Sequence, residues 1–299
     1  MSGSPSDLRR LLGGSQPVIA PGVFNALFAR IVERAGFPAV YVSGAGVANS
    51  LLGQPDIGMV TMSEMVTVAA NICNVVDIPV IVDADTGFGG VHNVARTVIE
   101  YQRAGVAAIQ IEDQKLPKRC GHFDSKEVVP VGEMLDRIHA ACDARAAEDG
   151  ILIIARTDAA GPHGIDEAIS RAARYGEAGA DLLFVEAPRN REELERVGRE
   201  LSAWPLVANM VEHGKTPLLP AAELAELGFS LVIFPGSITR TVTRAAETVL
   251  EHLASKGSTS AVLGVMASFD EVNEVVGLTA ADDWEREIIG RASGRERRD

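Results

Sequence analysis

The sequence contains little cysteine and few aromatic residues. Its three cysteines, Cys73, Cys120 and Cys142, are an odd number, and no pair has the spacing of a metal-binding CxxC motif. Neither a disulfide framework nor a structural zinc site is therefore predicted. Aromatic residues make up only 5% of the chain, whereas 46% of it is hydrophobic. This composition indicates a large, mostly aliphatic core with reduced thiols.

The sequence also lacks the features of a membrane-inserted or exported protein. No apolar run approaches the roughly 20 residues that a membrane helix needs. Segment 1–14 has neither an apolar core nor a small-residue cleavage site. The 28 lysines and arginines are outnumbered by 41 aspartates and glutamates, which gives a net charge of −13. This charge disfavours nucleic acid and anionic membranes as partners, so we expect a cytoplasmic protein that binds neither.

What the sequence does contain is a regular succession of short apolar runs and amphipathic helical patterns. Continuous apolar runs predict parallel strands buried on both faces. The predicted strands are 17–23, 39–44, 79–85, 107–113, 151–158, 182–187, 206–210 and 231–237. The helical patterns between them include 25–35, 63–75, 93–104, 131–147, 166–178 and 191–201. Eight such units predict an α/β fold, a closed (β/α)₈ TIM barrel.

No linker or low-complexity block interrupts residues 17–256. We therefore expect one domain over residues 1–299, with a barrel core at about 17–256 and C-terminal helices at about 257–290. Within the latter, 260–277 is expected to be helical. From Gly290 onward the sequence GRASGRERRD predicts a frayed polar tail.

Acidic residues gather at the carboxyl ends of the predicted strands, which share one face of a parallel barrel. Asp83 and Asp85 end the third strand, Glu112 lies at the end of the fourth, and Asp56 follows the second. Converging carboxylates repel one another unless a positive charge lies between them. These hard oxygen ligands favour Mg²⁺ or Mn²⁺, with some contacts through water, over zinc. A hydrogen-bonded network without an ion is the alternative.

Other strand ends carry groups that could bind a carboxylate. The loop Ser43-Gly44-Ala45-Gly46 could bring backbone N–H groups close to such a ligand, although a plain turn fits the same sequence. Arg156 and Asn209 are suited to hold a carboxylate or an enolate oxygen. For Arg156, a structural ion pair with Glu186 is the alternative.

The segment 118–123, KRCGHF, places Cys120 on the same face. Lys118, Arg119 and His122 would lower the pKa of the thiol, and Gly121 would let the loop bend over the site. Such a thiol could act as a nucleophile, a general acid or a general base, and the alternative is a loop cysteine without a role. Cys73 and Cys142 lie within helical patterns and are expected to be packing residues.

Six segments together resemble the isocitrate lyase and phosphoenolpyruvate mutase superfamily over residues 17–277. They read VYVSGAG, PVIVDADTGFGG, IQIEDQKLPKRCGH, IIARTDA, FVEAP and ANMVEHGKTP. KRCGH after IEDQ is the most specific of them. It resembles the carbon–carbon lyase branch, which includes methylisocitrate lyases, dimethylmalate lyases and petal-death-type proteins.

The resemblance implies a Mg²⁺-dependent retro-Claisen or retro-aldol cleavage. The substrate would be a 2-hydroxy di- or tricarboxylate, and the products a 2-oxo acid such as pyruvate and a carboxylic acid. It also implies a C-terminal helix exchanged between subunits of a homotetramer, a dimer of dimers.

The implied roles are carried over motif by motif. Asp83, Asp85, Asp56 and Glu112 match metal-binding carboxylates, and Ser43, Gly44 and Ala45 match a cradle for a substrate carboxylate. Arg156, Glu186 and Asn209, with Arg119 and Gly121 of the loop, are expected to contact substrate. Tyr41 matches a tyrosine beneath the scissile bond. Cys120 matches the acid that protonates the leaving carbanion, with Lys118 and His122 setting its protonation.

Several alternatives stay open. A Schiff-base aldolase is disfavoured because none of the eight predicted strands contains a lysine. A phosphoenolpyruvate or phosphonate mutase, an oxaloacetate or phosphonopyruvate hydrolase, or a catalytically silent barrel remains possible within the same superfamily. For the substrate, VEHGKT is closer to the EGGKT form of the dimethylmalate and petal-death branch, whereas Arg119 points to methylisocitrate. His213 and Ala45 depart from the usual glycines.

Overall fold

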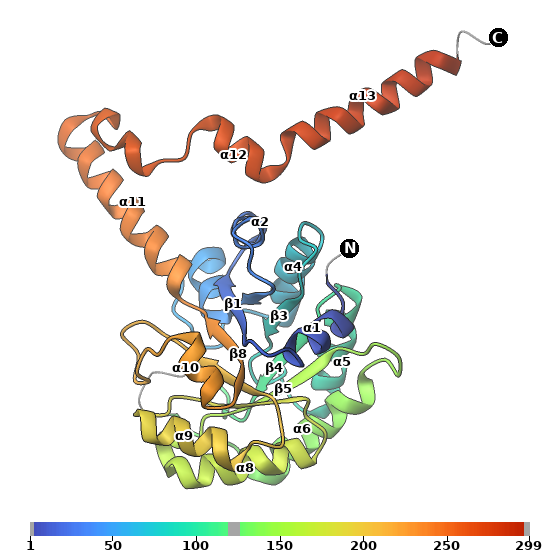
Figure 1. Ribbon diagram of the computed structural model, residues 1–299, viewed down its shortest axis with the longest axis vertical. Helices are drawn as coiled ribbons and strands as arrows, with labels where there is room; N and C mark the ends of the chain where they lie inside the picture. The colour runs from blue at the N-terminus through green and yellow to red at the C-terminus, as the bar shows by residue number, and fades with distance from the viewer. Residues whose placement is uncertain (1–2, 119–125, 296–299) are drawn as a thin grey trace. The chain divides into compact units, whose positions relative to one another are not determined.

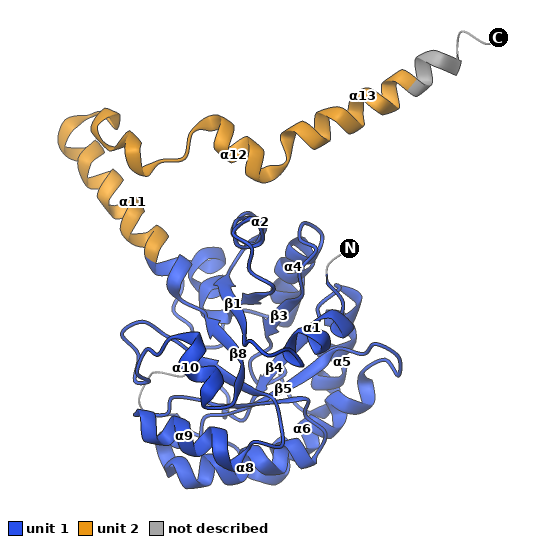
Figure 2. Ribbon diagram, viewed as in Figure 1, with its two compact units in different colours: residues 1–240 blue, residues 241–299 orange. Residues whose placement is uncertain are grey.

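The computed structural model describes residues 3–118 and 126–295. The chain divides into two compact units, residues 1–240 and residues 241–299 (Figure 2). The first unit contains the whole barrel. The assignment of residues 1–299 to a single domain stays a prediction.

The first unit is built on a closed barrel of parallel strands in the order β1 to β8 (Figure 1). Val18 of the first strand pairs with Leu231 of the last, which closes the ring. The strands are β1 Val18–Val23, β2 Val40–Val42, β3 Val80–Asp83, β4 Ala108–Glu112, β5 Leu152–Thr157, β6 Leu182–Val185, β7 Leu206–Asn209 and β8 Phe229–Phe234. The predicted (β/α)₈ barrel is confirmed.

The amphipathic patterns form helices that connect the strands. The predicted helices are found as α2 Ala26–Arg34, α4 Met62–Cys73, α5 Val91–Arg103, α6 Val131–Ala144, α8 Ile165–Glu177 and α9 Arg191–Glu200. Local signals set several of their first residues. Asn25 caps α2 by accepting the Phe28 N–H at 3.1 Å, and Thr61 and Glu64 form a capping box at α4. The short helices α7 Ala160–His163 and α10 Ala221–Glu226 complete this set.

One helix that was not predicted precedes the first strand of the barrel. Helix α1, Pro5–Leu12, begins at a capping box formed by Ser4 and Asp7. Its Leu8 is fully buried in a cluster that includes Val18, Ala39 and Ile81 from the starts of the strands. Its apolar face therefore packs against the amino-terminal end of the barrel, opposite the strand ends that carry the acidic residues.

Two predicted strand ends are helical instead. Gly44 begins the short helix α3 Gly44–Val47, which continues into the π-helical turn Ala48–Leu52. Ser237, predicted to end the last strand, begins α11 Ser237–Lys256. In the first case Ser43 accounts for the change, because its hydroxyl accepts the Gly46 N–H at 3.2 Å and so caps a helix.

Beyond residue 240 the chain forms the rest of α11, the 3₁₀ turn Ser260–Val265, α12 Phe269–Val276 and α13 Leu278–Arg295. Helical structure predicted for 260–277 is confirmed. The frayed tail predicted from Gly290 was wrong as far as Arg295, because α13 continues to that residue. None of the helices that the structure describes is long and apolar enough to cross a membrane.

Candidate active site

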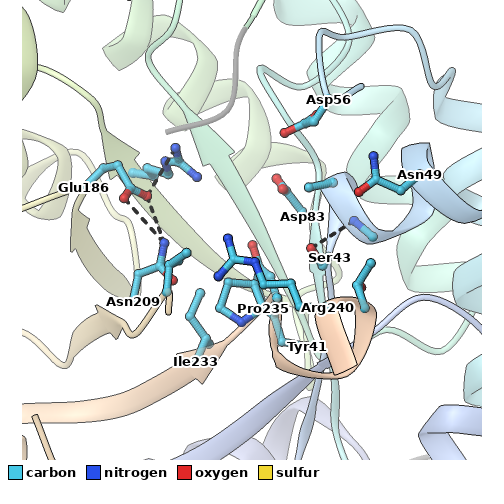
Figure 3. Close-up of a pocket in the computed structure, with 16 residues that line it drawn as sticks. Tyr41, Ser43, Asn49, Asp56, Asp83, Glu186, Asn209, Ile233, Pro235 and Arg240 are labelled. Atoms are coloured by element: carbon cyan, nitrogen blue, oxygen red, sulfur yellow. Dashed lines mark hydrogen bonds and ion pairs between the residues drawn. The ribbon is translucent and has the colours of Figure 1, made fainter. Parts of the chain in front are cut away.

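The carboxyl ends of the strands surround a pocket of about 140 Å³ in the first unit. Figure 3 shows Asp56 and Asp83 on one side of it and Glu186 and Asn209 on the opposite side. Most of the sequence-predicted residues that the structure describes lie in or next to this pocket. The pocket therefore has two halves. The acidic half is lined by Asp56 and Asp83, and the other half is centred on Arg156.

Next to the acidic half, the Lys118 ammonium group lies between carboxylates, and Lys118 and Asp85 line a neighbouring pocket. Its Nζ is 2.5 Å from Asp56 Oδ1 and 2.6 Å from Asp85 Oδ1, and the side chain is only 4% exposed. Burial alone would lower the pKa of Lys118, but the charges of Asp85, Asp83 and Asp56 raise it well above its ordinary value. Lys118 therefore stays protonated and balances part of the acidic charge.

Buried hydrogen bonds orient the carboxylate of Asp83. Its Oδ1 accepts the Asp85 backbone N–H at 3.1 Å and the Gln110 side-chain N–H at 3.3 Å. Tyr41, which lines the pocket, donates its hydroxyl proton to Gln110 Oε1 at 3.0 Å. Sequence reasoning missed Gln110, although a polar residue in the middle of the buried strand AIQIE was the available signal.

Gly44 lets helix α3 approach this cluster. A Cβ atom at Gly44 would lie 2.9 Å from Asp83 Oδ2 and 3.5 Å from Asp85 Oδ1. The first distance is shorter than a normal van der Waals contact. Ser43 and Ala45 on either side of the glycine line the pocket, as the predicted carboxylate cradle requires. The role of that cradle stays a prediction.

The acidic residues carry more negative charge than the local cations balance. Burial raises the pKa of Asp83, raises the pKa of Asp85 to about 6 against the opposing charge of Lys118, and raises that of Glu112 well above its ordinary value. Among the described residues, Glu112 Oε1 is buried without a hydrogen-bond partner. An additional cation would lower the raised pKa values of these carboxyl groups and would give Glu112 Oε1 a partner.

The donor chemistry fits a hard divalent cation. All of the candidate ligands offer carboxylate oxygen, the type that Mg²⁺ prefers. Within residues 3–118 and 126–295, however, no group of three histidine, cysteine, aspartate or glutamate side chains is arranged to hold an ion directly. A cation at this position would therefore retain several water ligands, which is usual for Mg²⁺.

The other half of the pocket is centred on Arg156. Its Nη2 lies 3.2 Å from Glu186 Oε2, and its Nε lies 3.4 Å from Glu112 Oε2. The amide of Asn209 donates to the same Glu186 oxygen at 3.2 Å. The ion pair between Arg156 and Glu186, stated above as an alternative, is therefore present, and both residues also line the pocket.

Arg156 has a further partner that sequence reasoning did not single out. Asp158 accepts from Nε of Arg156 at 2.9 Å and from Nη2 at 3.0 Å, and it also lies 2.6 Å from the ammonium group of Lys126. Burial alone would raise the pKa of Asp158, but the charges of Arg156 and Lys126 hold it well below the usual range. Asp158 therefore remains ionised.

Asp113 supports this region from within the protein. Its carboxylate accepts the Thr157 hydroxyl at 2.7 Å, the Asp158 backbone N–H at 2.8 Å and the Tyr175 hydroxyl at 2.9 Å. Burial and the nearby charge of Asp158 raise the pKa of Asp113. Asp113 thus fixes the end of β5 without reaching the pocket.

The pocket lining also contains residues that the sequence did not indicate as site residues. Val211, Ile233 and Pro235 supply apolar surface, and Arg240 lies at the same wall (Figure 3). The guanidinium of Arg240 contacts the carboxylate of Glu212 at 3.2 Å and also donates to its backbone oxygen. The lining of the pocket is therefore partly apolar.

Four predicted site residues, Arg119, Cys120, Gly121 and His122, lie outside the described residues. Their roles stay predictions from the sequence. The other two cysteines lie in helices, with Cys73 buried in α4 and Cys142 half-buried in α6. Both lie in helices as predicted, and the thiol of Cys142 donates to the Gly179 carbonyl at 3.3 Å; their packing role stays a prediction.

Comparison with known proteins places this site in a family. The protein-family model described as phosphoenolpyruvate phosphomutase matches residues 8–254 of this chain. The chain is 46% identical to 2,3-dimethylmalate lyase of Eubacterium barkeri, over 87% of this chain and 89% of that protein. It is 47% identical to 2-methylisocitrate lyase of Aeropyrum pernix, over 86% of this chain and 82% of that protein.

Solved structures agree with this assignment. A crystal structure of 2,3-dimethylmalate lyase, described as a PEP mutase/isocitrate lyase superfamily member, superimposes with a TM-score of 0.91 at 40% identity, covering 96% of both chains. A phosphonopyruvate hydrolase complex with oxalate and Mg²⁺ has a TM-score of 0.84 at 30% identity, covering 97% of this chain and 99% of the other. The chain belongs to the phosphoenolpyruvate phosphomutase family, within the PEP mutase/isocitrate lyase superfamily.

Proposed function

We propose that this protein is a Mg²⁺-dependent carbon–carbon lyase. It would cleave a 2-hydroxy di- or tricarboxylate of the 2,3-dimethylmalate or 2-methylisocitrate type into a 2-oxo acid, such as pyruvate, and a carboxylic acid. The observation that carries the proposal is the division of the pocket. Buried carboxylates suited to a cation face an arginine and an amide suited to a carboxylate or enolate oxygen. The named activities of the two relatives support it.

The metal would be held by the acidic half. Asp83, Asp85 and Glu112, with Asp56, are the proposed ligands, some of them through water, and Lys118 would remain beside them as a fixed positive charge. Bound there, Mg²⁺ or Mn²⁺ would polarise the oxygen at C2 of the substrate and its neighbouring carboxylate. The Mg²⁺ complex of the related phosphonopyruvate hydrolase supports this choice of ion.

The chain's own residues would bind and orient the substrate. Arg156 and Asn209, both at the pocket and both linked to Glu186, are proposed to hold a substrate carboxylate and the developing enolate oxygen. The backbone of Ser43, Gly44 and Ala45 is proposed to hold a second carboxylate. Tyr41 keeps its proton because burial and the charge of Asp83 raise its pKa well above the ordinary value. It therefore presents a neutral hydroxyl beneath the substrate.

Cleavage requires a proton to leave the substrate hydroxyl and another to reach the departing carbanion. We assign the second transfer to the thiol of Cys120, with Lys118, Arg119 and His122 controlling its protonation. Gly121 is proposed to bring the loop backbone to the substrate. These assignments come from the motif 118–122 and its position after β4.

We also propose a cytoplasmic homotetramer, a dimer of dimers with an exchanged C-terminal helix. Phe269 of α12 and Trp284 of α13 are 83% and 66% exposed, which favours a further packing partner for these helices. Size-exclusion chromatography with light scattering would measure the assembly, and a monomer would contradict it.

A substrate panel tests the proposed function. The purified protein with Mg²⁺ is incubated with 2-methylisocitrate, 2,3-dimethylmalate, isocitrate, oxaloacetate and phosphonopyruvate, and products are identified by NMR. We expect a 2-oxo acid and a carboxylic acid from one of the first two. Turnover of phosphonopyruvate or oxaloacetate alone would assign the protein to a hydrolase instead, and no turnover of any would count against catalysis of this class.

A further inference from the structure

The Arg156 guanidinium group is fixed on three sides. Its Cζ lies 5.2 Å from the centre of the Phe184 ring, which supports one face of the group. Asp158 binds Nε and Nη2, and Glu186 binds Nη2. Among the described residues, no partner contacts Nη1. Nη1 is therefore the nitrogen left for a ligand in the pocket.

Asp158 differs from Glu186, the carboxylate that contacts Arg156 from the pocket. Both side chains are fully buried, but Glu186 lines the pocket and Asp158 does not. Its two contacts to Arg156, at 2.9 and 3.0 Å, are also the shortest that the guanidinium makes to a carboxylate. Any effect of Asp158 on a substrate must therefore pass through Arg156.

Two further interactions hold Asp158 in place. Its backbone N–H is bonded to Asp113, and its Oδ1 lies 2.6 Å from the Lys126 ammonium group, which is 4% exposed. The second cation balances a buried negative charge that also contacts Arg156. The Asp158 carboxylate is therefore held in place by the Asp113 contact to its backbone and by the Lys126 ammonium group.

We propose that Asp158 is a positioning residue, which orients Arg156 so that Nη1 faces the substrate, while Lys126 balances the charge of Asp158. The inference rests on the proposed function because it takes Arg156 to bind a substrate carboxylate. It adds a residue that acts only through the arginine. A bidentate carboxylate partner fixes the plane of a guanidinium group more strictly than a single contact does.

The test is Asp158→Asn, assayed with whichever of 2-methylisocitrate and 2,3-dimethylmalate the wild type cleaves. The amide cannot accept from both nitrogens in the same way, so Arg156 loses its fixed plane. We expect KM to rise at least about tenfold, roughly the effect of one charge-assisted hydrogen bond, with a smaller fall in kcat. A loss confined to kcat, with KM unchanged, would overturn the proposal.

A second variant separates positioning from stability. Asp158→Asn leaves Lys126 buried without its carboxylate, and that alone could destabilise the protein. In the double variant Lys126→Met/Asp158→Asn this unpaired charge is gone. We expect its melting temperature to recover towards the wild-type value while KM stays high. Recovery of KM together with stability would show that Asp158 has a purely structural role.

Asp181→Asn provides a matched control. Asp181 also pairs with an arginine, Arg145, at 2.6 Å, but it lies just before β6, at the opposite end of the barrel. We expect it to lower stability without raising KM.

If the wild type cleaves none of the substrates, the proposed function fails. A crystal structure of the double variant then still tests the positioning role. An Arg156 guanidinium in its wild-type position over Phe184 would overturn that role, and a displaced one would support it.

Discussion

Replacing Lys118 by methionine perturbs the centre of the acidic cluster most directly. Methionine has a similar length but no charge, so Asp56 and Asp85 lose the ammonium group that lies 2.5 and 2.6 Å from them. Breaking a buried ion pair by removing one partner costs about 3–5 kcal/mol. We take the lower end, about 3 kcal/mol, because the two carboxylates keep some solvent contact, being 13% and 11% exposed, and can take up protons.

A loss of about 3 kcal/mol corresponds to a fall in melting temperature of about 6–12 °C for a unit of this size. The measurement is a thermal melt by circular dichroism at neutral pH, in EDTA and in excess Mg²⁺. The deficit should appear in EDTA and shrink in Mg²⁺, because a divalent cation bound to the same carboxylates supplies the missing positive charge. In excess Mg²⁺, the activity of the variant should fall below that of the wild type.

Lys115→Met is the control for this change. Lys115 lies three residues earlier and pairs with Glu127 at 3.0 Å, but the two side chains are 63% and 72% exposed. Exposed pairs contribute little to stability, so its melting curve should match that of the wild type. The reasoning is refuted if Lys118→Met melts within about 2 °C of wild type in EDTA, or if Mg²⁺ leaves its deficit unchanged.

Two further substitutions test the site. Gly44→Ala would place a Cβ atom 2.9 Å from Asp83 Oδ2 and displace this carboxylate. Such overpacking costs about 1–3 kcal/mol. We therefore expect the Mg²⁺ concentration for half-maximal activity to rise about tenfold. Gly132→Ala, where nothing lies within 4 Å, should leave that concentration unchanged, and equal behaviour of the two variants would contradict the close approach. Cys120→Ser should lower kcat at least about 100-fold while oxalate binding measured by calorimetry is retained, with Cys142→Ser as a control. Near-normal turnover of Cys120→Ser would remove the thiol from the chemistry.

The barrel could be predicted from the sequence because its signals are local. Each strand is a short apolar run and each connecting helix has its own amphipathic pattern, so element order alone indicates a closed parallel sheet. Helix α1 has an equally local signal in Ser4, Pro5 and Asp7, but it precedes the first strand and adds no repeat to the pattern. The helical end of α13 could not be read from its polar composition, because composition alone does not exclude a helix.

The sequence indicated which residues would gather at the site, but it did not indicate most of the contacts between their side chains. The carboxyl ends of parallel strands share one face, so Asp83, Asp85, Glu112 and Arg156 could be grouped from strand order alone. Pairing depends on distances that sequence does not contain. Lys118 was expected to influence the neighbouring thiol, but the sequence did not indicate that its ammonium group also binds Asp56, which lies 62 residues away in the chain. Asp158 and Gln110 were missed for the same reason, because their importance lies in the side chains they orient.

A coupled assay for 2-oxo-acid release tests whether this protein cleaves a carbon–carbon bond in a metal-dependent reaction. The protein is stripped with EDTA, assayed with 2,3-dimethylmalate and with 2-methylisocitrate, and assayed again after Mg²⁺ is restored. We predict no release in EDTA and full recovery with Mg²⁺ for at least one substrate. Release that continues unchanged in EDTA, or none with either substrate when Mg²⁺ is present, would contradict this prediction.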